Sequence, residues 1–203
     1  MLGFPAATEI KKLITKKKVY EHFGAEMSAE RRKRFDADIA RMTLVNEVSP
    51  VSLNLEPGET VQNFFILHVV LKSKDFDPQN ISYLSRLFGQ RLVMVLEVDQ
   101  QQQMAVFQTR LYMTDWSEAD SLRLPLVGLN LDRVWENIVS QIADVEMEPG
   151  RSLDDQLAVA ARREKLQREI ARLEKQARAE RQPKKKFELV QKLNKLRIEE
   201  QQL

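Results

Sequence analysis

Apolar residues follow two different patterns along this chain. Residues 61–73 read "VQNFFILHVVLKS" and residues 91–99 read "RLVMVLEVD". Both are short runs, rich in β-branched and aromatic residues and mostly apolar on both faces, so they predict two strands at the buried centre of a sheet. Beyond residue 152, apolar residues instead recur every three or four positions, which is the period of a helix.

Shorter apolar segments predict further strands on either side of these two. Ser49 and Pro50 interrupt one stretch, and the four glutamines at 100–103 are expected to form a hairpin loop before a returning strand. Pro125 marks the last segment as an edge or an end, because proline cannot donate a hydrogen bond to a neighbouring strand. The additional strands are expected at 43–48, 51–55, 104–116 and 121–128.

Four segments of the first 150 residues have helical features. The clearest starts at Asn130, a good N-cap, and continues with apolar residues at the spacing of a helix packed on a core. Ser28 is expected to cap another helix, in which Phe35, Ile39 and Met42 share one face. The expected helices are 10–23, which is short and basic, 28–42, 76–89 and 131–145.

The tail contains two apolar seams joined at a proline. Four residues of the first seam repeat at spacings of 4, 3 and 4, and three leucines of the second repeat at 4 and 3. Pro183 ends the first helix, so the two arms are expected to fold back as an antiparallel helical hairpin in which each seam buries the other. The seam residues are Leu166, Ile170, Leu173, Ala177, Leu189, Leu193 and Leu196.

These elements predict an α+β fold in two parts. Residues 1–150 are expected to form a body, with a mostly antiparallel sheet of four to six strands packed by helices and a basic N-terminal helical segment. Residues 151–203 are expected to form a C-terminal coiled-coil hairpin. No apolar run is long enough to span a bilayer, and the lack of cysteines fits a reducing compartment. We therefore expect a cytoplasmic protein without a membrane partner.

Charge is distributed unevenly along the chain. Residues 1–41 contain ten Lys and Arg against six Asp and Glu, residues 42–160 contain eight against seventeen, and residues 161–203 contain fourteen against seven. A basic head and a basic tail therefore flank an acidic middle. The two ends either fold back onto the acidic body or form separate surfaces for partners.

The basic residues of the head and the tail are the candidate binding residues. They are Arg31, Arg32, Lys33, Arg34, Arg168, Arg172, Lys175, Lys184, Lys185 and Lys186. In the tail, these cations belong to a solvated coiled-coil surface with pairs such as Glu164–Arg168, contact nucleic-acid phosphates, or dock on an acidic protein surface. The spacing of the residues leaves these three interpretations open.

Motifs for catalysis are missing from the chain. No glycine pattern could cradle a phosphate, and His22 and His68 are far apart in the sequence. A magnesium-dependent nuclease would use carboxylates near strand ends, but no Asp…Glu-x-Lys pattern occurs on consecutive strands. The carboxylates concerned are Glu47, Asp75, Asp77, Glu97 and Asp99. We therefore expect no catalytic residue, no metal and no cofactor, and we expect Trp116 to cover the core rather than to stack on a base.

Six segments give the chain a resemblance to a known family. They are "GFPAATEIKK" (3–12), "LVNEVSPVSLNL" (44–55), "LKSKD" (71–75), "LYMTDW" (111–116), "GLNLDRVWENIVSQIA" (128–143) and "LNKLRIE" (193–199). In this order they resemble a bacterial and archaeal domain-of-unknown-function family, number 4391 in that series, from Gly3 to about Leu196. The most specific part runs from Gly128 to Asp132 and continues into Trp135-Glu136-Asn137.

The resemblance implies a genetic context and no activity. Members of this family tend to lie beside genes for DNA methyltransferases and helicase-type ATPases of restriction-like, antiphage systems. The chain departs from the family pattern before Ser49-Pro50, where a lysine is common, and at Leu67-His68-Val69, where a glutamate is common. We therefore predict a non-enzymatic accessory subunit that docks on a helicase or methyltransferase partner. Direct binding of DNA or RNA by the basic head and tail is the alternative, and a nuclease is a third hypothesis.

Overall fold

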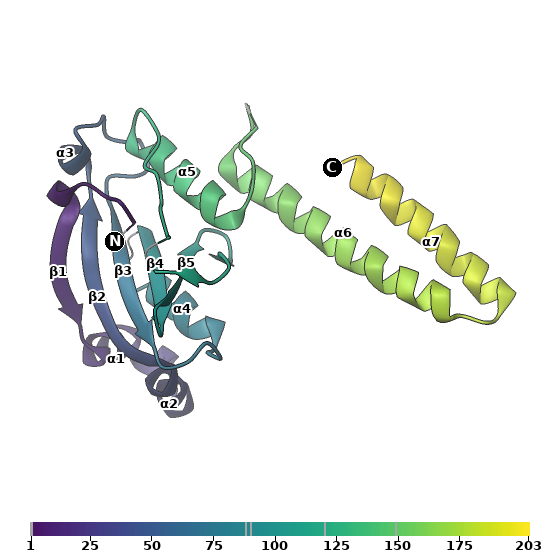
Figure 1. Cartoon of the computed structure of the whole chain (residues 1–203), viewed down its shortest axis with the longest axis horizontal. Coiled ribbons are helices and arrows are strands. Elements are labelled where there is room, and N and C mark those ends of the chain that lie inside the picture. Colours follow the sequence, from purple (N-terminus) through teal and green to yellow (C-terminus); the bar gives the residue numbers. More distant parts are fainter. Residues whose placement is uncertain (1, 88, 90, 120, 149) are drawn as a thin grey trace. The chain divides into compact units, whose positions relative to one another are not determined.

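The computed structural model describes residues 2–87, 89, 91–119, 121–148 and 150–203. The chain divides into two compact units, the body, Met1–Asp144, and the tail unit, Val145–Leu203 (Figure 1). The body contains a mixed sheet with helices, and the tail unit contains two long helices.

The body is built on a seven-stranded sheet with the order β1-β2-β3-β4-β5-β6, in which β7 pairs with β5. The strands are β1 (Glu9–Ile14), β2 (Ile39–Val48), β3 (Phe64–Leu71), β4 (Arg91–Val98), β5 (Gln101–Phe107), β6 (Leu111–Met113) and β7 (Ser117–Glu118). β3 and β4 are parallel, because a helix carries the chain back between them, and the other described pairs are antiparallel. The predicted α+β fold with a mostly antiparallel sheet is confirmed.

Helices pack on the sheet and make up the tail unit. They are α1 (Lys16–Phe23), α2 (Ala29–Asp38), α3 (Pro50–Leu53), α4 (Pro78–Ser85), α5 (Leu131–Ala143), α6 (Leu153–Ala179) and α7 (Pro183–Gln201), with short 3-10 turns η1 (Ala6–Thr8) and η2 (Gly24–Glu26). The predicted caps are present: Ser28 Oγ accepts the N–H of Arg31 at 3.2 Å, and Asn130 Oδ1 accepts the N–H of Arg133 at 3.0 Å. Within the described residues, none of the helices is long and apolar enough to cross a membrane.

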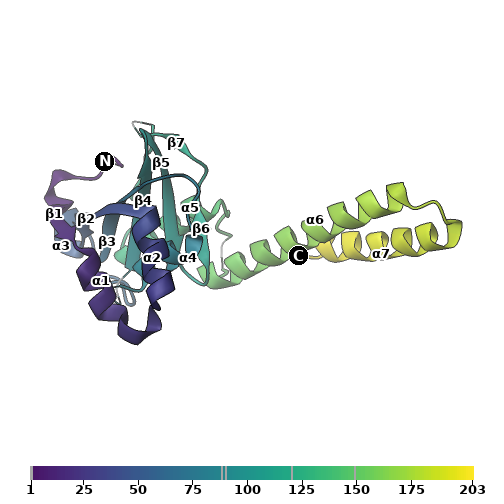
Figure 2. The ribbon, with the colours of Figure 1, turned by 90° about the horizontal axis from the view of Figure 1, so that it is seen from below.

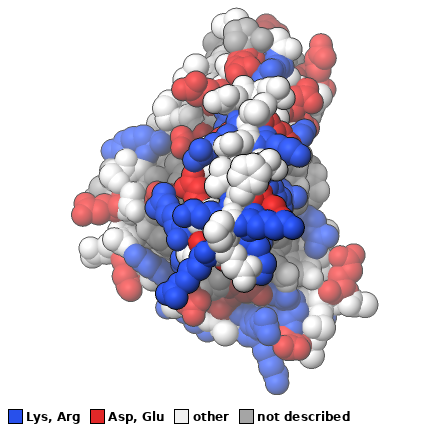
Figure 3. Space-filling model, turned by 90° about the vertical axis from the view of Figure 1, so that its right-hand side faces the viewer, with Lys and Arg blue, Asp and Glu red and all other residues white. Residues whose placement is uncertain are grey.

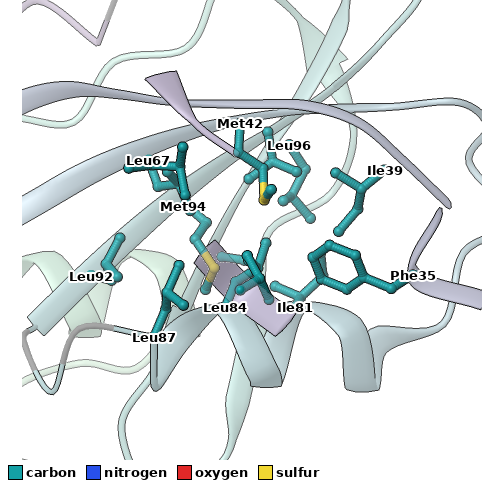
Figure 4. Packing of buried hydrophobic residues seen from close by; sticks show 14 of the residues in the cluster. Phe35, Ile39, Met42, Leu67, Ile81, Leu84, Leu87, Leu92, Met94 and Leu96 are labelled. Atoms are coloured by element: carbon teal, nitrogen blue, oxygen red, sulfur yellow. The ribbon is translucent and has the colours of Figure 1, made fainter. Parts of the chain in front are cut away.

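One face of the sheet forms a large hydrophobic core with α1, α2 and α4. Figure 4 shows Met42, Leu67 and Met94 of three neighbouring strands grouped with Phe35 of α2 and Ile81 of α4. All five side chains are buried. In Figure 2, α1 and α2 lie in front of the strands. Because side chains alternate along a strand, the opposite face needs its own cover.

The cover of that opposite face comes from α5. The rings of Phe64 on β3 and Trp135 on α5 lie 5.6 Å apart, and Leu131, Val134 and Ile138 of the same helix are completely buried. Among the segments expected to be helical in the body, this one has the clearest pattern of apolar residues, and the helix is confirmed.

The basic N-terminal segment is only partly helical, contrary to the helix predicted over 10–23. Residues 9–14 form β1, whose Ile14 pairs with Met42 and is buried, and α1 begins only after Thr15. Thr15 caps α1, because its side chain accepts the N–H of Lys18 at 3.4 Å. Pairing with β2, which is distant in the sequence, therefore overrides the local helical pattern.

The helix predicted over 28–42 ends early, at Asp38, where β2 begins without a loop. Ile39 and Met42 do face the same core as Phe35, but from a strand. The backbone oxygen of Asp38 accepts the N–H of Lys72 at 2.8 Å, so hydrogen bonding beside β3 holds the start of β2. Spacings of three and four residues do not distinguish one helix from a helix that continues directly into a strand.

The strand predicted over 51–55 is also wrong, because residues 50–53 form the short helix α3. Ser49 and Ser52 make a reciprocal capping box: the Ser49 hydroxyl accepts the N–H of Ser52 at 3.2 Å, and the Ser52 hydroxyl accepts the N–H of Ser49 at 2.9 Å. Pro50 occupies the first turn, where its missing N–H costs nothing.

Two further predictions fail around the fifth strand. The hairpin turn lies at Asp99 and Gln100, both with positive φ, and β5 already starts at Gln101, so three of the four glutamines belong to a strand and only Gln100 lies in the turn. Residues 121–128, all of which the structure describes, contain no strand. They run as irregular chain, and the N–H of Leu124 donates to the oxygen of Leu2 at 3.2 Å.

Candidate functional site

The tail unit is the hairpin that the leucine spacing predicts. Ile170, Leu173 and Ala177 of α6 form a buried cluster with Leu193 of α7, and two partly buried leucines pack against the cluster. Those two are Leu189 and Leu196, and Leu166 is also buried. These leucines therefore have their partners within the hairpin and need none from another chain.

Ion pairs between the helices align the two arms. Arg162 pairs with Glu199 at 2.6 Å, Lys192 with Glu169 at 3.2 Å, and Arg197 with Glu174 at 2.6 Å. All lie at the surface, where such a pair contributes about 0–1 kcal/mol. The pairs help to set the alignment of the helices, while the apolar seam supplies most of the stability.

The outer face of α6, turned away from the seam, is basic. Helical geometry places Arg168, Arg172, Lys175 and Arg178 on this side, with small residues such as Ala171 beside them. The three arginines pair with glutamates of the same helix, Glu164, Glu169 and Glu174, and Lys175 has no ion pair with another described residue. Ion pairs at the surface of this kind contribute only about 0–1 kcal/mol each.

The outer face of α7 is different, because it carries an exposed apolar stripe. Phe187 is 63% exposed, Val190 39% and Ile198 56%. Their spacings of three and eight place them on one side of α7, away from the leucine seam. We call Phe187, Val190 and Ile198 the α7 stripe. Figure 3 shows uncharged atoms between Lys and Arg side chains on the face of the molecule that includes the hairpin.

Lysines border the α7 stripe and crowd the start of the helix. Helical geometry places Lys184 and Lys195 along one side of the stripe and Lys186 on the other. Lys184, Lys185 and Lys186 are exposed, and none of the three makes an ion pair with a described residue. The predicted basic cluster at the tip of the hairpin is therefore accessible. The stripe itself escaped the sequence analysis, although the spacing of Phe187, Val190 and Ile198 off the leucine seam is a signal that could have revealed it.

The basic residues of the head are placed very differently. Arg31 forms an ion pair with Asp77, at the start of α4, and its guanidinium lies 5.9 Å from the centre of the Tyr83 ring. Its side chain is only 19% exposed. Burial alone would raise the pKa of Asp77, but hydrogen bonds from the Gln79 N–H and from Arg31 outweigh this and hold the pKa below its usual value. Arg31 thus fastens α2 to α4.

Two further residues of the head have partners in the body. Arg32 donates to the backbone oxygens of Met27 at 3.1 Å and Gly24 at 2.9 Å, and Arg34 pairs with Glu30 at 3.2 Å. Lys33 is exposed and has no ion pair with a described residue. The structure therefore does not bring the four basic residues of the head together as one free surface.

The carboxylates weighed for a nuclease are not gathered either. A carboxylate oxygen of Glu97 accepts a hydrogen bond from Gln102 Nε2 at 2.5 Å. The same oxygen lies 3.0 Å from His68 Nε2. Burial would raise the pKa of Glu97, but these two neighbours outweigh it and lower the pKa. Asp77 caps α4, and Asp99 lies in the turn after β4. Across the described residues, no three His, Asp or Glu side chains are grouped so that they could hold a metal ion.

Trp116 packs partly buried against the main core, and Lys74 Nζ lies 5.3 Å from the centre of its ring. The ring therefore contacts both the core and Lys74 of the same chain, as expected for a residue that covers the core.

The comparison with known proteins shows a family. A family model described as a domain of unknown function, DUF4391, matches residues 2–199. The chain belongs to the DUF4391 family. The resemblance seen in the sequence is confirmed over nearly the whole chain. No curated protein and no solved structure matches it.

The segment that most specifically suggested DUF4391 builds the fold. Asp132 accepts the N–H groups of Glu59 at 2.7 Å and Val61 at 2.8 Å, and the hydroxyl of Thr60 at 2.9 Å. A Cβ on Gly58 would lie 2.5 Å from Asp132 Oδ1, so this close approach requires glycine. Burial would raise the pKa of Asp132, but these hydrogen bonds hold it below its usual value.

Other polar residues of the same DUF4391 segment hold irregular chain in place. Asn137 Nδ2 donates to the oxygen of Val127 at 2.9 Å, and Gln141 Nε2 donates to that of Pro125 at 3.3 Å. Trp135 Nε1 donates to Gln108 at 3.2 Å. Asn137 and Gln141 satisfy backbone groups of 121–128 that no strand pairs, and all three residues therefore have structural roles in the body.

Proposed function

We propose that this DUF4391 protein is a non-enzymatic interaction subunit that docks on a partner protein through its helical hairpin. The observation that carries this proposal is the α7 stripe. The leucine seam already accounts for the folding of the hairpin, so Phe187, Val190 and Ile198 have no role in pairing α6 with α7. An apolar side chain left in water forgoes about 1.5–3 kcal/mol of burial free energy, which a partner would supply.

The partner we propose is a helicase or a methyltransferase of a bacterial DNA-modification or restriction-like antiphage system. This part of the proposal rests on the gene neighbourhood that membership of DUF4391 implies. The cytoplasm, where such enzymes act, is the proposed location.

Co-purification tests the proposal. The full chain is expressed with the neighbouring helicase and methyltransferase, as wild type and as the double variant Phe187→Ser with Ile198→Ser. We expect the wild type to retain a neighbour and the double variant to lose it. The matched control is Gln167→Ser with Ala171→Ser, which places two serines at exposed positions of α6 and should keep the partner. A wild-type chain that binds neither neighbour would contradict the proposal.

A second function, nucleic-acid binding, is favoured by the outer face of α6. Four cations follow one side of this helix without a large apolar residue among them, and the exposed lysines 184–186 lie at the end of the same hairpin. Neutralised phosphates release counterions, so binding of a DNA duplex should weaken steeply with added salt. We expect Lys184, Lys185 and Lys186, changed together to Glu, to abolish binding, and Arg168→Glu with Lys175→Glu to weaken it strongly. Affinity that does not depend on salt would exclude this function.

A further inference from the structure

The α7 stripe differs from an ordinary exposed apolar patch in its length and its borders. Phe187 and Ile198 are eleven residues apart, which corresponds to about 16 Å, or three turns, of helix. A straight stripe of this length matches one face of another helix better than a small ligand or an extended loop. The stripe therefore has the dimensions of a helix-docking surface.

Cations border the stripe on both sides. Lys184 and Lys195 line one side, and Lys186 and Arg197 line the other. Arg197 pairs with Glu174 across the hairpin, whereas the three lysines have no ion pair with a described residue.

Two carboxylates lie on α7 near this surface. Glu199 is occupied by Arg162 at 2.6 Å, and Glu188 lies on the Lys184 side, farther round the helix from the stripe. The borders of the stripe are therefore net positive.

We infer that the partner segment is an amphipathic α-helix whose apolar face is bordered by Asp and Glu, and that it lies along the outer face of α7, on the side turned away from α6. This inference rests on the proposed function and names the chemistry of its partner. Carboxylates on both borders of the incoming helix would meet Lys184, Lys195 and Lys186 while its apolar residues cover the stripe.

The same charges argue against a second copy of this chain as the occupant. In a parallel pair, the Lys184 and Lys195 side of one α7 would face the Lys186 and Arg197 side of the other. In an antiparallel pair, the Lys184 and Lys195 side of one α7 would face the same side of the other, and so would the side with Lys186. Like charges would meet in both orientations, so a partner with the opposite charge fits better.

A polar residue within the stripe adds a requirement for the partner. Asn194 lies on the same side of α7, between Val190 and Ile198, and it is exposed in the hairpin. An amide covered by another helix needs a hydrogen-bonding partner, so the incoming helix should place a polar side chain opposite Asn194. Such a pair sets the register of two helices.

Two synthetic helical peptides with identical leucine stripes test the inference, one bordered by glutamates and the other by lysines. Each is labelled and titrated with the full chain, and binding is followed by fluorescence anisotropy. The glutamate peptide should bind about tenfold or more tightly than the lysine peptide, and added salt should narrow the difference. Phe187→Ala with Ile198→Ala should weaken the binding of the glutamate peptide about tenfold or more, whereas Ala171→Ser, on the outer face of α6, should leave its affinity within about twofold.

Several outcomes would overturn the inference. One is equal binding of the two peptides, and another is binding that ignores the change of Phe187 and Ile198. A homodimer that dissociates in the Phe187→Ala and Ile198→Ala variant would make a second copy the occupant. A DNA duplex that displaces the glutamate peptide from wild type would assign the surface to nucleic acid instead.

The result separates this inference from the proposed function. If a neighbour co-purifies through the stripe but the glutamate peptide has no advantage, the chemistry of the partner is wrong and the docking function stands. If the glutamate peptide binds selectively but no neighbour co-purifies, the inference is supported and the identity of the partner is wrong.

Discussion

The body and the hairpin use their charged side chains in different ways. In the body, Arg31, Arg32 and Asp132 are engaged by groups of the same chain, at distances that leave little capacity for a ligand. In the hairpin, the ion pairs and the seam join α6 to α7, and the outer faces of both helices remain free of such ties. This difference makes the hairpin, rather than the body, the better candidate for a binding surface.

The strongest test of this comparison is within the hairpin. Leu173→Ala removes a buried seam residue and should destabilise the hairpin by about 2–5 kcal/mol, because the seam has few other side chains to fill the space. Phe187→Ala, on the outer face, should change stability by no more than about 0.5 kcal/mol. Hydrogen exchange of the α7 amides measures both. A similar loss in the two variants would show that the stripe also holds the hairpin together.

A second test compares an engaged carboxylate of the body with a free cation of the hairpin. Asp132→Asn keeps the size of the side chain but removes the charge that accepts N–H groups of Glu59 and Val61, so it should cost about 1.5–3 kcal/mol. Lys175→Gln should be close to neutral. Urea unfolding measures both, with Trp fluorescence reporting on the body and the helical circular dichroism signal reporting on the hairpin. A neutral Asp132→Asn would mean that the 58–61 loop is held by other contacts.

The engaged carboxylates also predict how the body responds to pH. The pKa values of Asp77, Glu97 and Asp132 are all below their usual values in the folded chain, so folding favours the ionised forms. Their contribution is complete above the unfolded pKa values, near 4, and is lost as the pH falls from about 5 through the folded values. Urea unfolding at a series of pH values should therefore give a falling free energy in acid. Asp132→Asn should flatten this fall, and an unchanged slope would contradict the role given to Asp132.

The smallest effect is expected from the ion pairs between the helices. Arg197→Ala breaks the contact with Glu174, which is exposed to solvent, and should cost about 0–1 kcal/mol. The measurement is the thermal midpoint of the helical signal in the variant and in wild type. The difference between the two midpoints should be smaller at high salt than at low salt, because salt screens the ion pair. A large, salt-independent loss would instead assign Arg197 a packing role.

The elements that sequence patterns predict well are those whose signal is local and complete. Helix α5 has its cap, Asn130, and its whole apolar face within one short segment, and the leucine seams of α6 and α7 need only each other. The failures share a different cause. Ile39 and Met42 have helical spacing from Phe35, yet pairing with β3, distant in the sequence, makes them part of a strand.

Candidate binding residues follow the same division. A basic residue has the same charge wherever it lies, so composition could not separate Arg31, which joins α2 to α4, from Lys184, which is free. Only the positions of Asp77 and Tyr83, brought in from α4, reveal the structural role of Arg31.

The sequence by itself determined the mostly antiparallel α+β class, the helical hairpin with its leucine seam, and membership of DUF4391, because periodicity, caps and matching segments are properties of neighbouring residues. The tertiary structure decided where strands begin and which arginines are engaged. These depend on partners that folding brings together from distant parts of the chain, and a pattern of local spacings contains no record of them.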